Sequence, residues 1–292
     1  MKRIFLFLLT NLAVVLVLSI VARLTGLDAW LAAHGQSYTG LLVFAALFGF
    51  GGSFISLLLS KTMAKRAMGV QVIDPQTTDP TGRWLLGVVE HHARTVGLTM
   101  PEVGIFQQPD PNAFATGWNR NAALVAVSSG LLQNMGRDEV EAVLGHEMTH
   151  VANGDMVTLA LLQGVVNTFV IFLSRVIAGL LSRSENGRGG GAYFITVIVL
   201  QLVFGILANL IVMWFSRRRE FRADRGGAQL AGKSRMIAAL EDLKRVHEPL
   251  PSQQFAAFGI AEGPVAGGLK RLFMSHPPLD ERIAALRSLN IA

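Results

Sequence analysis

Cysteine is absent from the 292-residue sequence, and this absence limits the chemistry open to the protein. Without cysteine there can be no disulfide bond, no thiolate ligand for a metal ion and no cysteine nucleophile. Any metal ion must therefore be held by histidine, aspartate or glutamate side chains. Histidine is also scarce, with seven residues in the chain, so histidines at a regular spacing are informative.

Charged residues are few as well. They make up 16% of the chain, whereas hydrophobic residues make up 51%, a balance that excludes an ordinary soluble protein and favours membrane-spanning helices. The formal net charge of +6 raises the question of a nucleic-acid partner. However, the basic residues lie mainly beside apolar runs, and no basic face is interleaved with aromatic residues. We therefore expect no nucleic-acid binding.

Four apolar runs are long enough to cross a bilayer, at residues 4–22, 39–60, 156–181 and 192–215. Basic residues flank both outer ends of the first pair, which predicts a hairpin with the N-terminus in the cytoplasm. A cleaved signal peptide is the alternative for the first run, but no clear small-x-small cleavage site follows it. The third and fourth runs contain polar residues, so the alternative for them is a hairpin in the membrane interface or packed on protein.

The segment between the two apolar pairs is mixed in character and is expected to fold in water. Helical spacing favours a helix at residues 83–96, in which His91 and His92 are interpreted as surface histidines, because neighbours in sequence point apart on a helix. Short segments bounded by turn residues predict three strands, at residues 103–106, 112–117 and 122–128. The last two strands should form a hairpin.

A His-Glu-x-x-His pattern occupies residues 146–150, within a run that is expected to be helical. Residues four apart share one face of a helix, so His146 and His150 can direct their imidazoles at one ion. Glu147 lies one step further round and can reach a water molecule bound to that ion. Two imidazoles, one further ligand and a water molecule make an open, catalytic zinc site. Two surface histidines on an amphipathic helix are the alternative interpretation.

The ends of this helix also carry signals. Asp138, with Glu141 three residues later, predicts a capping box at its start. The pair Asn153 and Gly154 indicates its end, and Asp155 is expected to cap the next element.

The third metal ligand has to come from elsewhere in the chain. An extended astacin-like motif would need glycine and histidine where the sequence has Asn153 and Met156. Glu220 is the better candidate, and Asp224, four residues later on the same helical face, could accept a hydrogen bond from a ligating imidazole. Two membrane crossings between His150 and Glu220 would return the chain to the same side of the membrane. A solvated surface pair beside arginines is the alternative.

Taken together, these motifs resemble the HtpX family of bacterial membrane-bound zinc metallopeptidases, relatives of the CAAX prenyl proteases. The resemblance runs nearly end to end and rests on residues 9–14, 48–53, 112–117, 146–155, 220–221, 223–224 and 276–278. It implies an endopeptidase of the bacterial inner membrane with one zinc ion per chain and a cytoplasmic active site, associated with quality control of misfolded membrane proteins under stress.

The resemblance also implies roles for individual residues. His146, His150 and Glu220 would be the zinc ligands, and Glu147 would be the catalytic base. His276 is a candidate donor to the developing oxyanion, although the alternative is that it caps the last helix. At position 222 the chain has arginine where a family member carries histidine, but this position is not a ligand.

A strand near the motif is the expected binding edge for the substrate. An extended peptide could add to it through main-chain hydrogen bonds, which would favour unfolded segments with little sequence preference. The strand residues assigned to this role are Asn112, Ala113, Phe114, Ala115 and Thr116.

We therefore predict a mainly α integral membrane protein with four apolar helices and a cytoplasmic α+β, zincin-like (gluzincin) catalytic domain containing a small β-hairpin or sheet. The predicted parts are a membrane hairpin at residues 1–60, a first catalytic part at 61–155, a second apolar hairpin at 156–216 and a second catalytic part at 217–292. The expected partners are unfolded or misfolded membrane-protein substrates and the lipid bilayer, and no oligomeric state is predicted.

Other functions compete with this interpretation. An intramembrane serine protease would use Ser53, but that residue lacks a Gly-x-Ser-x-Gly frame, and no later apolar run contains histidine. An intramembrane zinc protease would need the motif inside a membrane span, yet Arg137, Glu139 and Glu141 stand just before it. A membrane scaffold or holdase with a structural zinc ion would bind metal without cleaving a denatured substrate.

Overall fold

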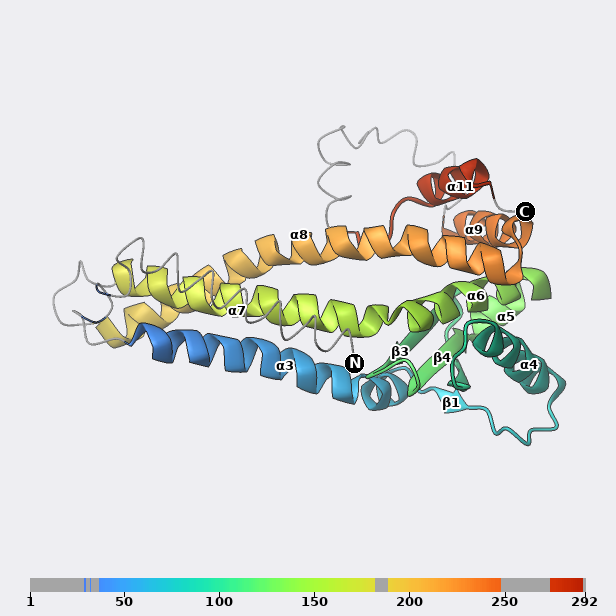
Figure 1. The fold of residues 1–292 in the computed structure, drawn as a ribbon, viewed down its shortest axis with the longest axis horizontal. Helices are drawn as coiled ribbons and strands as arrows, with labels where there is room; N and C mark the ends of the chain where they lie inside the picture. Colours follow the sequence, from blue (N-terminus) through green and yellow to red (C-terminus); the bar gives the residue numbers. More distant parts are fainter. Residues whose placement is uncertain (1–28, 30–31, 33–36, 182–188, 248–273, 291–292) are drawn as a thin grey trace, which may run out of the picture. The chain divides into compact units, whose positions relative to one another are not determined.

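The computed structural model describes residues 29, 32, 37–181, 189–247 and 274–290 of the chain (Figure 1). Contacts between Cα atoms divide the chain into two compact units. The first consists of residues 1–56 and 159–212, and the second consists of residues 57–158 and 213–292.

Among the described residues, three helices are long and apolar enough to cross a membrane. They are α3 (Tyr38–Ala67), α7 (Asp155–Leu181) and α8 (Gly189–Ala231). These helices contain the second, third and fourth predicted apolar runs. The first run, residues 4–22, lies outside the described residues. The described part of the chain therefore shows three of the four apolar helices expected from the sequence.

Small residues bring α3 and α7 together within the first unit. A Cβ atom on Gly49 would clash with the Thr168 hydroxyl and would lie 2.7 Å from the Thr168 backbone nitrogen. A Cβ atom on Gly164 would lie 2.5 Å from the ring of Phe50. Glycines at both places let the two helix backbones approach closely, as is common between membrane helices.

Helix α8 runs through the boundary between the fourth apolar run and the predicted second catalytic part. It continues without a break across the three arginines at residues 217–219 to Ala231. Arginine is a good helix former, so it marks a change of polarity and not a helix end. The helix ends before Gly232, whose φ of 104° suits glycine and few other residues.

The second unit contains a four-stranded sheet. Its strands are β1 (Gln71–Val72), β2 (Glu102–Phe106), β3 (Ala113–Gly117) and β4 (Ala123–Ser128), in the order β1-β2-β4-β3. The predicted hairpin is confirmed, because β3 and β4 pair antiparallel with Ala113 opposite Val127. β2 and β4 are parallel, and every residue of β4 is buried. β3 therefore forms an edge of this sheet.

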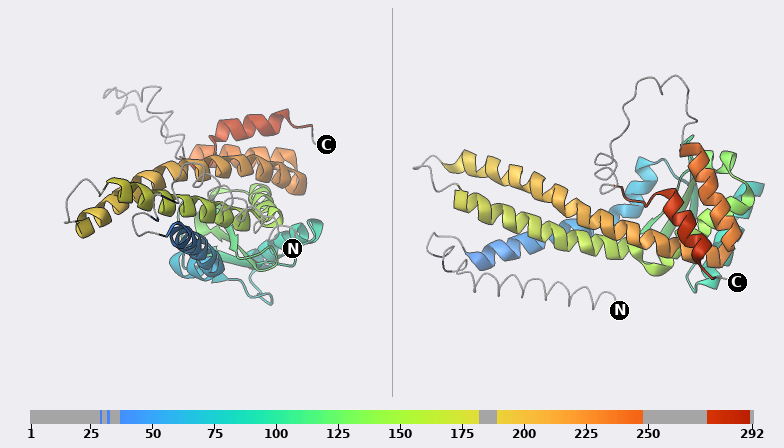
Figure 2. Two further views of the ribbon diagram at one scale, coloured as in Figure 1. Left: turned by 60° about the vertical axis from the view of Figure 1, so that its left-hand side comes forward. Right: turned by 90° about the horizontal axis from the view of Figure 1, so that it is seen from above.

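The described residues of this unit form five further helices. They are α4 (Pro80–Thr95), α5 (Ser129–Asn134), α6 (Arg137–Asn153), α9 (Lys233–His247) and α11 (Leu279–Ser288). α6 contacts α4, α9 and strands β3 and β4, while α11 lies along α9 (Figure 2). The shared core places the His-Glu-x-x-His helix at the centre of the unit. Fully buried members of this core include Leu85, Val125, Leu144, Leu240 and Leu286.

The start of α6 differs from the prediction. The N-cap is Gly136, without a side-chain hydrogen bond, and Asp138 already lies in the first turn. Asp138 and Glu141 instead form ion pairs with Arg235 of α9, at 3.2 and 3.0 Å. The predicted capping box is therefore wrong, because both carboxylates turn toward a cation on another helix.

His92 was also misplaced as a surface residue. Its ring is fully buried between α4 and α6, and its Nε2 lies 3.2 Å from the backbone oxygen of Glu141. Burial lowers the pKa of His92 below the usual 6.5 despite this contact. His92 falls on the inward stripe of α4 with Leu85 and Val89, so the packing of α4 on α6 decides its environment. His91, its neighbour, is exposed as expected.

Candidate active site

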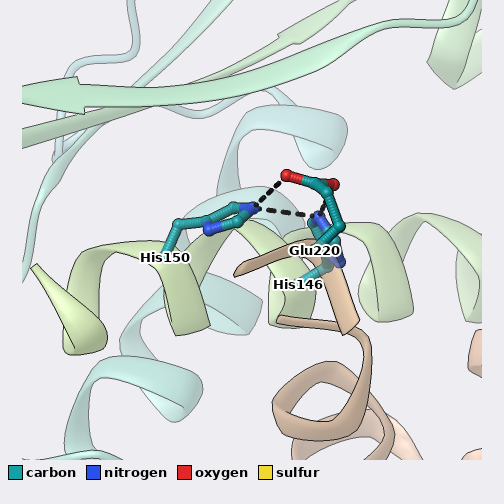
Figure 3. A group of neighbouring side chains, drawn as sticks. All are labelled: His146, His150 and Glu220. Carbon is teal, nitrogen blue, oxygen red and sulfur yellow. Dashed lines mark hydrogen bonds and ion pairs between the residues drawn. The ribbon is translucent and has the colours of Figure 1, made fainter. Parts of the chain in front are cut away.

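Helix α6 carries the two histidines of the motif on one buried face. His146 is 6% exposed and His150 is 7% exposed. Their Nε2 atoms lie 3.2 Å apart (Figure 3). The helix ends four residues later at Gly154, whose φ of 60° lies in the left-handed region favoured by glycine. The regular helix up to that point brings both imidazoles to one place.

Glu220 reaches the same place from α8. Its fully buried carboxylate has Oε2 3.4 Å from Nε2 of His146 and Oε1 3.4 Å from Nε2 of His150. Figure 3 shows the three side chains converging from two helices. One potential ligand atom from each residue lies within 4.8 Å of the other two. These are the three side chains that the sequence singles out as ligands.

Glycines set the distance between α6 and α8. A Cβ atom on Gly226 would lie 2.8 Å from Cβ of Thr149, and one on Gly227 would lie 3.0 Å from the backbone nitrogen of His146. A Cβ atom on Gly145 would lie 3.4 Å from Gly227. Side chains at these positions would push the helices apart, so their absence lets Glu220 reach the imidazoles.

The three side chains fit a zinc ion. Bonds from zinc to nitrogen or oxygen are about 2.0–2.2 Å long, so two ligand atoms of a tetrahedral ion lie roughly 3.3–3.6 Å apart. The separations in this site are 3.2 and 3.4 Å. In addition, Oε1 of Glu220 is buried without a hydrogen-bond partner, and a cation would satisfy it.

Asp224 stands behind His146. Its Oδ1 lies 2.9 Å from Nδ1 of His146, which directs Nε2 toward the other two side chains. Arg282 of α11 holds Asp224 through two bonds, from Nε to Oδ2 at 2.8 Å and from Nη2 to Oδ1 at 2.5 Å. Burial alone would lower the pKa of Arg282, but the bonds to Asp224 outweigh it and raise the pKa above its usual value.

Asp155 stands behind His150 in the same manner. It was expected to cap the next element, but it is the first residue of α7, and its Oδ2 accepts a hydrogen bond from Nδ1 of His150 at 2.7 Å. Burial lowers the pKa of His150, whereas the hydrogen bond to Asp155 and the Glu220 carboxylate 3.4 Å away raise it, with a net result of about 9. A proton and a metal ion therefore compete for this ring.

A cleft of about 530 Å³ lies beside this group. His146 and Glu147 of α6 line it, together with Asn112 and Ala113 at the start of β3. Residues 114–116, the rest of the predicted substrate strand, do not line this cleft. Much of the remaining wall is apolar and comes from α9 and α11, including Met236, Leu240, Leu243 and Leu279.

His276 also lines the cleft. Its Nδ1 lies 2.8 Å from Oε2 of Glu220, and its side chain is 58% exposed. The alternative role as a helix cap is wrong, because the N-cap of α11 is Pro278 and no side chain caps that helix. His276 is therefore joined to the metal-facing carboxylate while its ring stays open to the cleft.

The sequence model of Peptidase family M48 matches residues 80–290, a segment that holds all of these side chains. The chain belongs to peptidase family M48. M48 enzymes are zinc-dependent metalloproteases, in agreement with the His-His-Glu group. With three apolar helices in its described part, this M48 chain is a membrane-bound, multi-pass metalloprotease.

Individual relatives extend this result over the whole chain. "Protease HtpX homolog" of Thiobacillus denitrificans is 63% identical over 294 residues, which cover 99% of this chain and 100% of that protein. "Protease HtpX" of Nitrosococcus oceani is 62% identical, over 98% of this chain and 99% of that protein.

Among solved structures, the crystal structure of S. mikatae Ste24p matches 96% of this chain with a TM-score of 0.58. At 17% identity this similarity shows a common fold alone, and the chain spans 66% of the length of that protein. The predicted resemblance to the HtpX proteases is confirmed by the two relatives, and the Ste24p structure adds a shared fold.

Sequence reasoning missed two residues of this M48 site. Asp155 had a local signal, because it is an acidic residue directly after the glycine that ends the motif helix. Arg282 had none, since it lies 58 residues from Asp224 on a helix that the sequence shows only as short and amphipathic.

Proposed function

We propose that this chain cleaves unfolded or misfolded segments of membrane proteins on the cytoplasmic side of the bacterial inner membrane, in quality control under stress. The observation that carries the proposal is one cleft lined by Glu147, by His146 and by the start of edge strand β3. A multi-pass metalloprotease with this cleft would meet polypeptide segments as they leave the bilayer.

The chemistry follows from the residues around the cleft. His146, His150 and Glu220 would hold the zinc ion, which when bound acidifies a water molecule and polarises the scissile carbonyl. Glu147 takes the proton of the attacking water on its carboxylate and passes it to the leaving amine. Glu147 is suited to this shuttle because it is partly exposed and lines the cleft.

His276 is proposed to stabilise the oxyanion. Its Nδ1–H donates to Oε2 of Glu220, because an ionised carboxylate can only accept. In the imidazolium form, Nε2–H is then free to donate to an oxygen in the cleft. The bond to Glu220 fixes the ring relative to the metal-facing group.

Strand β3 is proposed to hold the substrate. It pairs with β4 along one side and forms the edge of the sheet on the other. A peptide added to this edge is held by main-chain bonds, which any extended sequence can make. Asn112 and Ala113 lead from this edge into the cleft, so a peptide on β3 would pass Glu147. Unfolded segments can adopt this extended form, whereas folded ones cannot.

The decisive experiment measures cleavage of denatured casein by the purified full-length protein with and without 1,10-phenanthroline. Chelation should abolish cleavage. Glu147→Gln should keep one zinc ion per chain but lower the rate about 10²–10⁴-fold. Glu139→Gln is the matched control, since Glu139 is half-buried in the first turn of the same helix and outside the cleft.

Two results would count against the proposal. Wild-type cleavage by Glu147→Gln would remove Glu147 as the base. A protein that binds zinc but leaves casein intact would fit the scaffold with a structural metal ion.

The proposed side of the membrane has its own test. Because the chain has no cysteine, Ser288→Cys places a single thiol on the exposed face of α11. A membrane-impermeant maleimide should label it in inverted inner-membrane vesicles and not in right-side-out vesicles. The reverse pattern would place the site on the other side.

A further inference from the structure

Three arginines form a stripe on α8 just beyond its apolar part. Arg218, Arg222 and Arg225 are spaced four and three residues apart, so they share one helical face, and all three are exposed. We call this set the arginine stripe. It lies opposite Glu220 and Asp224, which the same two turns direct into the metal site. The stripe is therefore not part of the catalytic group.

The stripe continues an exposed apolar face of the same helix. Going toward the N-terminus at the same spacing, the exposed residues are Trp214, Ile211 and Leu207, with 55%, 52% and 53% of their surface open. The guanidinium of Arg218 lies 5.4 Å from the ring of Trp214. Tryptophan concentrates at the boundary between lipid tails and headgroups, so the stripe begins where the headgroups should lie.

The charges of the stripe are available to a partner. Among the residues that the structure describes, no carboxylate forms an ion pair with Arg218, Arg222 or Arg225. Along the helix they stand about 6, 12 and 16 Å beyond Trp214, at a rise of 1.5 Å per residue. The side chains of Arg218 and Arg222 can reach phosphates at the membrane surface. Arg225 is further away but still within about a Debye length of them, so it is attracted electrostatically.

We propose that the arginine stripe binds the headgroups of anionic phospholipids in the membrane that holds α8. The planar guanidinium matches the phosphate group and can bond it through two N–H groups. The apolar residues that precede the stripe contact the acyl chains of the same lipids. This surface would give the protein a preference for anionic lipid over zwitterionic lipid.

The test measures which lipid the full-length protein retains. Protein in detergent receives equal amounts of phosphatidylglycerol and phosphatidylcholine, and native mass spectrometry counts the bound molecules of each. Each basic residue near an anionic surface contributes about fivefold to binding. The triple change of Arg218, Arg222 and Arg225 to Gln should remove the phosphatidylglycerol preference. Single changes should weaken it in the order Arg218, Arg222, Arg225.

Two controls accompany this test. The triple change of Arg83, Arg94 and Arg245 to Gln removes the same charge from exposed positions on α4 and α9, and it should keep the preference. The triple change of the stripe to Lys keeps the charge and should retain most of the phosphatidylglycerol preference. This variant still tests the proposal if the Gln variant fails to fold.

The zinc content of the Gln variant, and its casein cleavage in phosphatidylcholine vesicles, should equal those of the wild type. An unchanged lipid preference in a stripe Gln variant that binds zinc would overturn the proposal. An equal loss of the phosphatidylglycerol preference in the control triple variant would overturn it as well. So would loss of that preference in a folded stripe Lys variant. Because lipid is counted directly, the result does not depend on whether the protein cleaves casein.

Discussion

The two metal-facing histidines of α6 are supported in different ways. His150 bonds to Asp155, which follows five residues later on the same stretch of chain. His146 bonds to Asp224 on α8, and Asp224 is itself held by Arg282 on α11. The first support is local, whereas the second exists only when three helices pack together.

This difference separates metal binding from stability. The local support can form as soon as α6 ends at Gly154, and its loss removes an orienting bond from one ring. The long-range support contains a buried ion pair, and removal of one partner leaves the other charge buried without compensation. Damage to the second support should therefore lower both zinc affinity and stability, while damage to the first should lower mainly zinc affinity.

The largest effect is expected from Arg282→Ala. This change leaves the carboxylate of Asp224, which is 1% exposed, buried without its cation. It should lower the free energy of unfolding by about 3–5 kcal/mol. Denaturant unfolding in detergent measures this. Arg287→Ala is the control on the same helix, since its ion pair with Glu241 is exposed and should contribute less than about 1 kcal/mol. An equal loss of unfolding free energy in the two variants would contradict the role given to Arg282.

Asp224→Ala should weaken zinc binding roughly 10–100-fold, because the ring of His146 loses the acceptor that orients it. It should also lower the melting temperature, since Arg282 is left buried without its partner. Zinc affinity is measured by competition with a fluorescent chelator. An affinity equal to that of the wild type would make Asp224 a bystander.

Asp155→Asn tests the local support. The amide oxygen can still accept from Nδ1 of His150 but lacks the charge, so zinc affinity should fall by about tenfold. The melting temperature of the zinc-free protein should fall less than in Asp224→Ala, because no buried guanidinium loses its partner. A larger loss of stability than in Asp224→Ala would reverse the comparison between the two supports.

The smallest effect concerns His92 of α4, whose ring is buried against α6 and belongs to neither support. Burial lowers its pKa from 6.5, so the unfolded chain takes up a proton that the folded chain resists, and stability should fall as the pH drops below 6.5. His92→Gln cannot titrate there. Its melting temperature should change less than that of the wild type between about pH 8 and about pH 5.5. Equal changes would mean that other groups cause the acid sensitivity.

Predictions from the sequence succeeded where the signal is local. Apolar runs predicted α3, α7 and α8, and two short segments joined by a turn predicted the β3–β4 hairpin, because run length and turn residues depend on neighbouring residues alone. The end of α6 at Gly154 also followed from a local rule, since glycine adopts the left-handed conformation without strain.

Predictions failed where a partner from another element intervened. Asp138 could serve as a cap, but Arg235 of α9 lies close enough to bind it. His92 could lie at the surface of an isolated helix, but α6 covers that face. In both cases the local preference was weaker than a tertiary contact that no sequence period reveals.

The spacing of His146 and His150 by itself determined that two imidazoles face one point, because 3.6 residues per turn align positions four apart. The absence of cysteine likewise restricted the remaining ligand to an acidic side chain or another histidine. The sequence offered Glu220 as the third ligand, but only the tertiary structure placed its carboxylate 3.4 Å from both imidazoles and brought Arg282 of α11 against Asp224. These placements depend on how closely α6 and α8 approach at Gly226 and Gly227, and such a distance is a property of packed helices and not of any single segment.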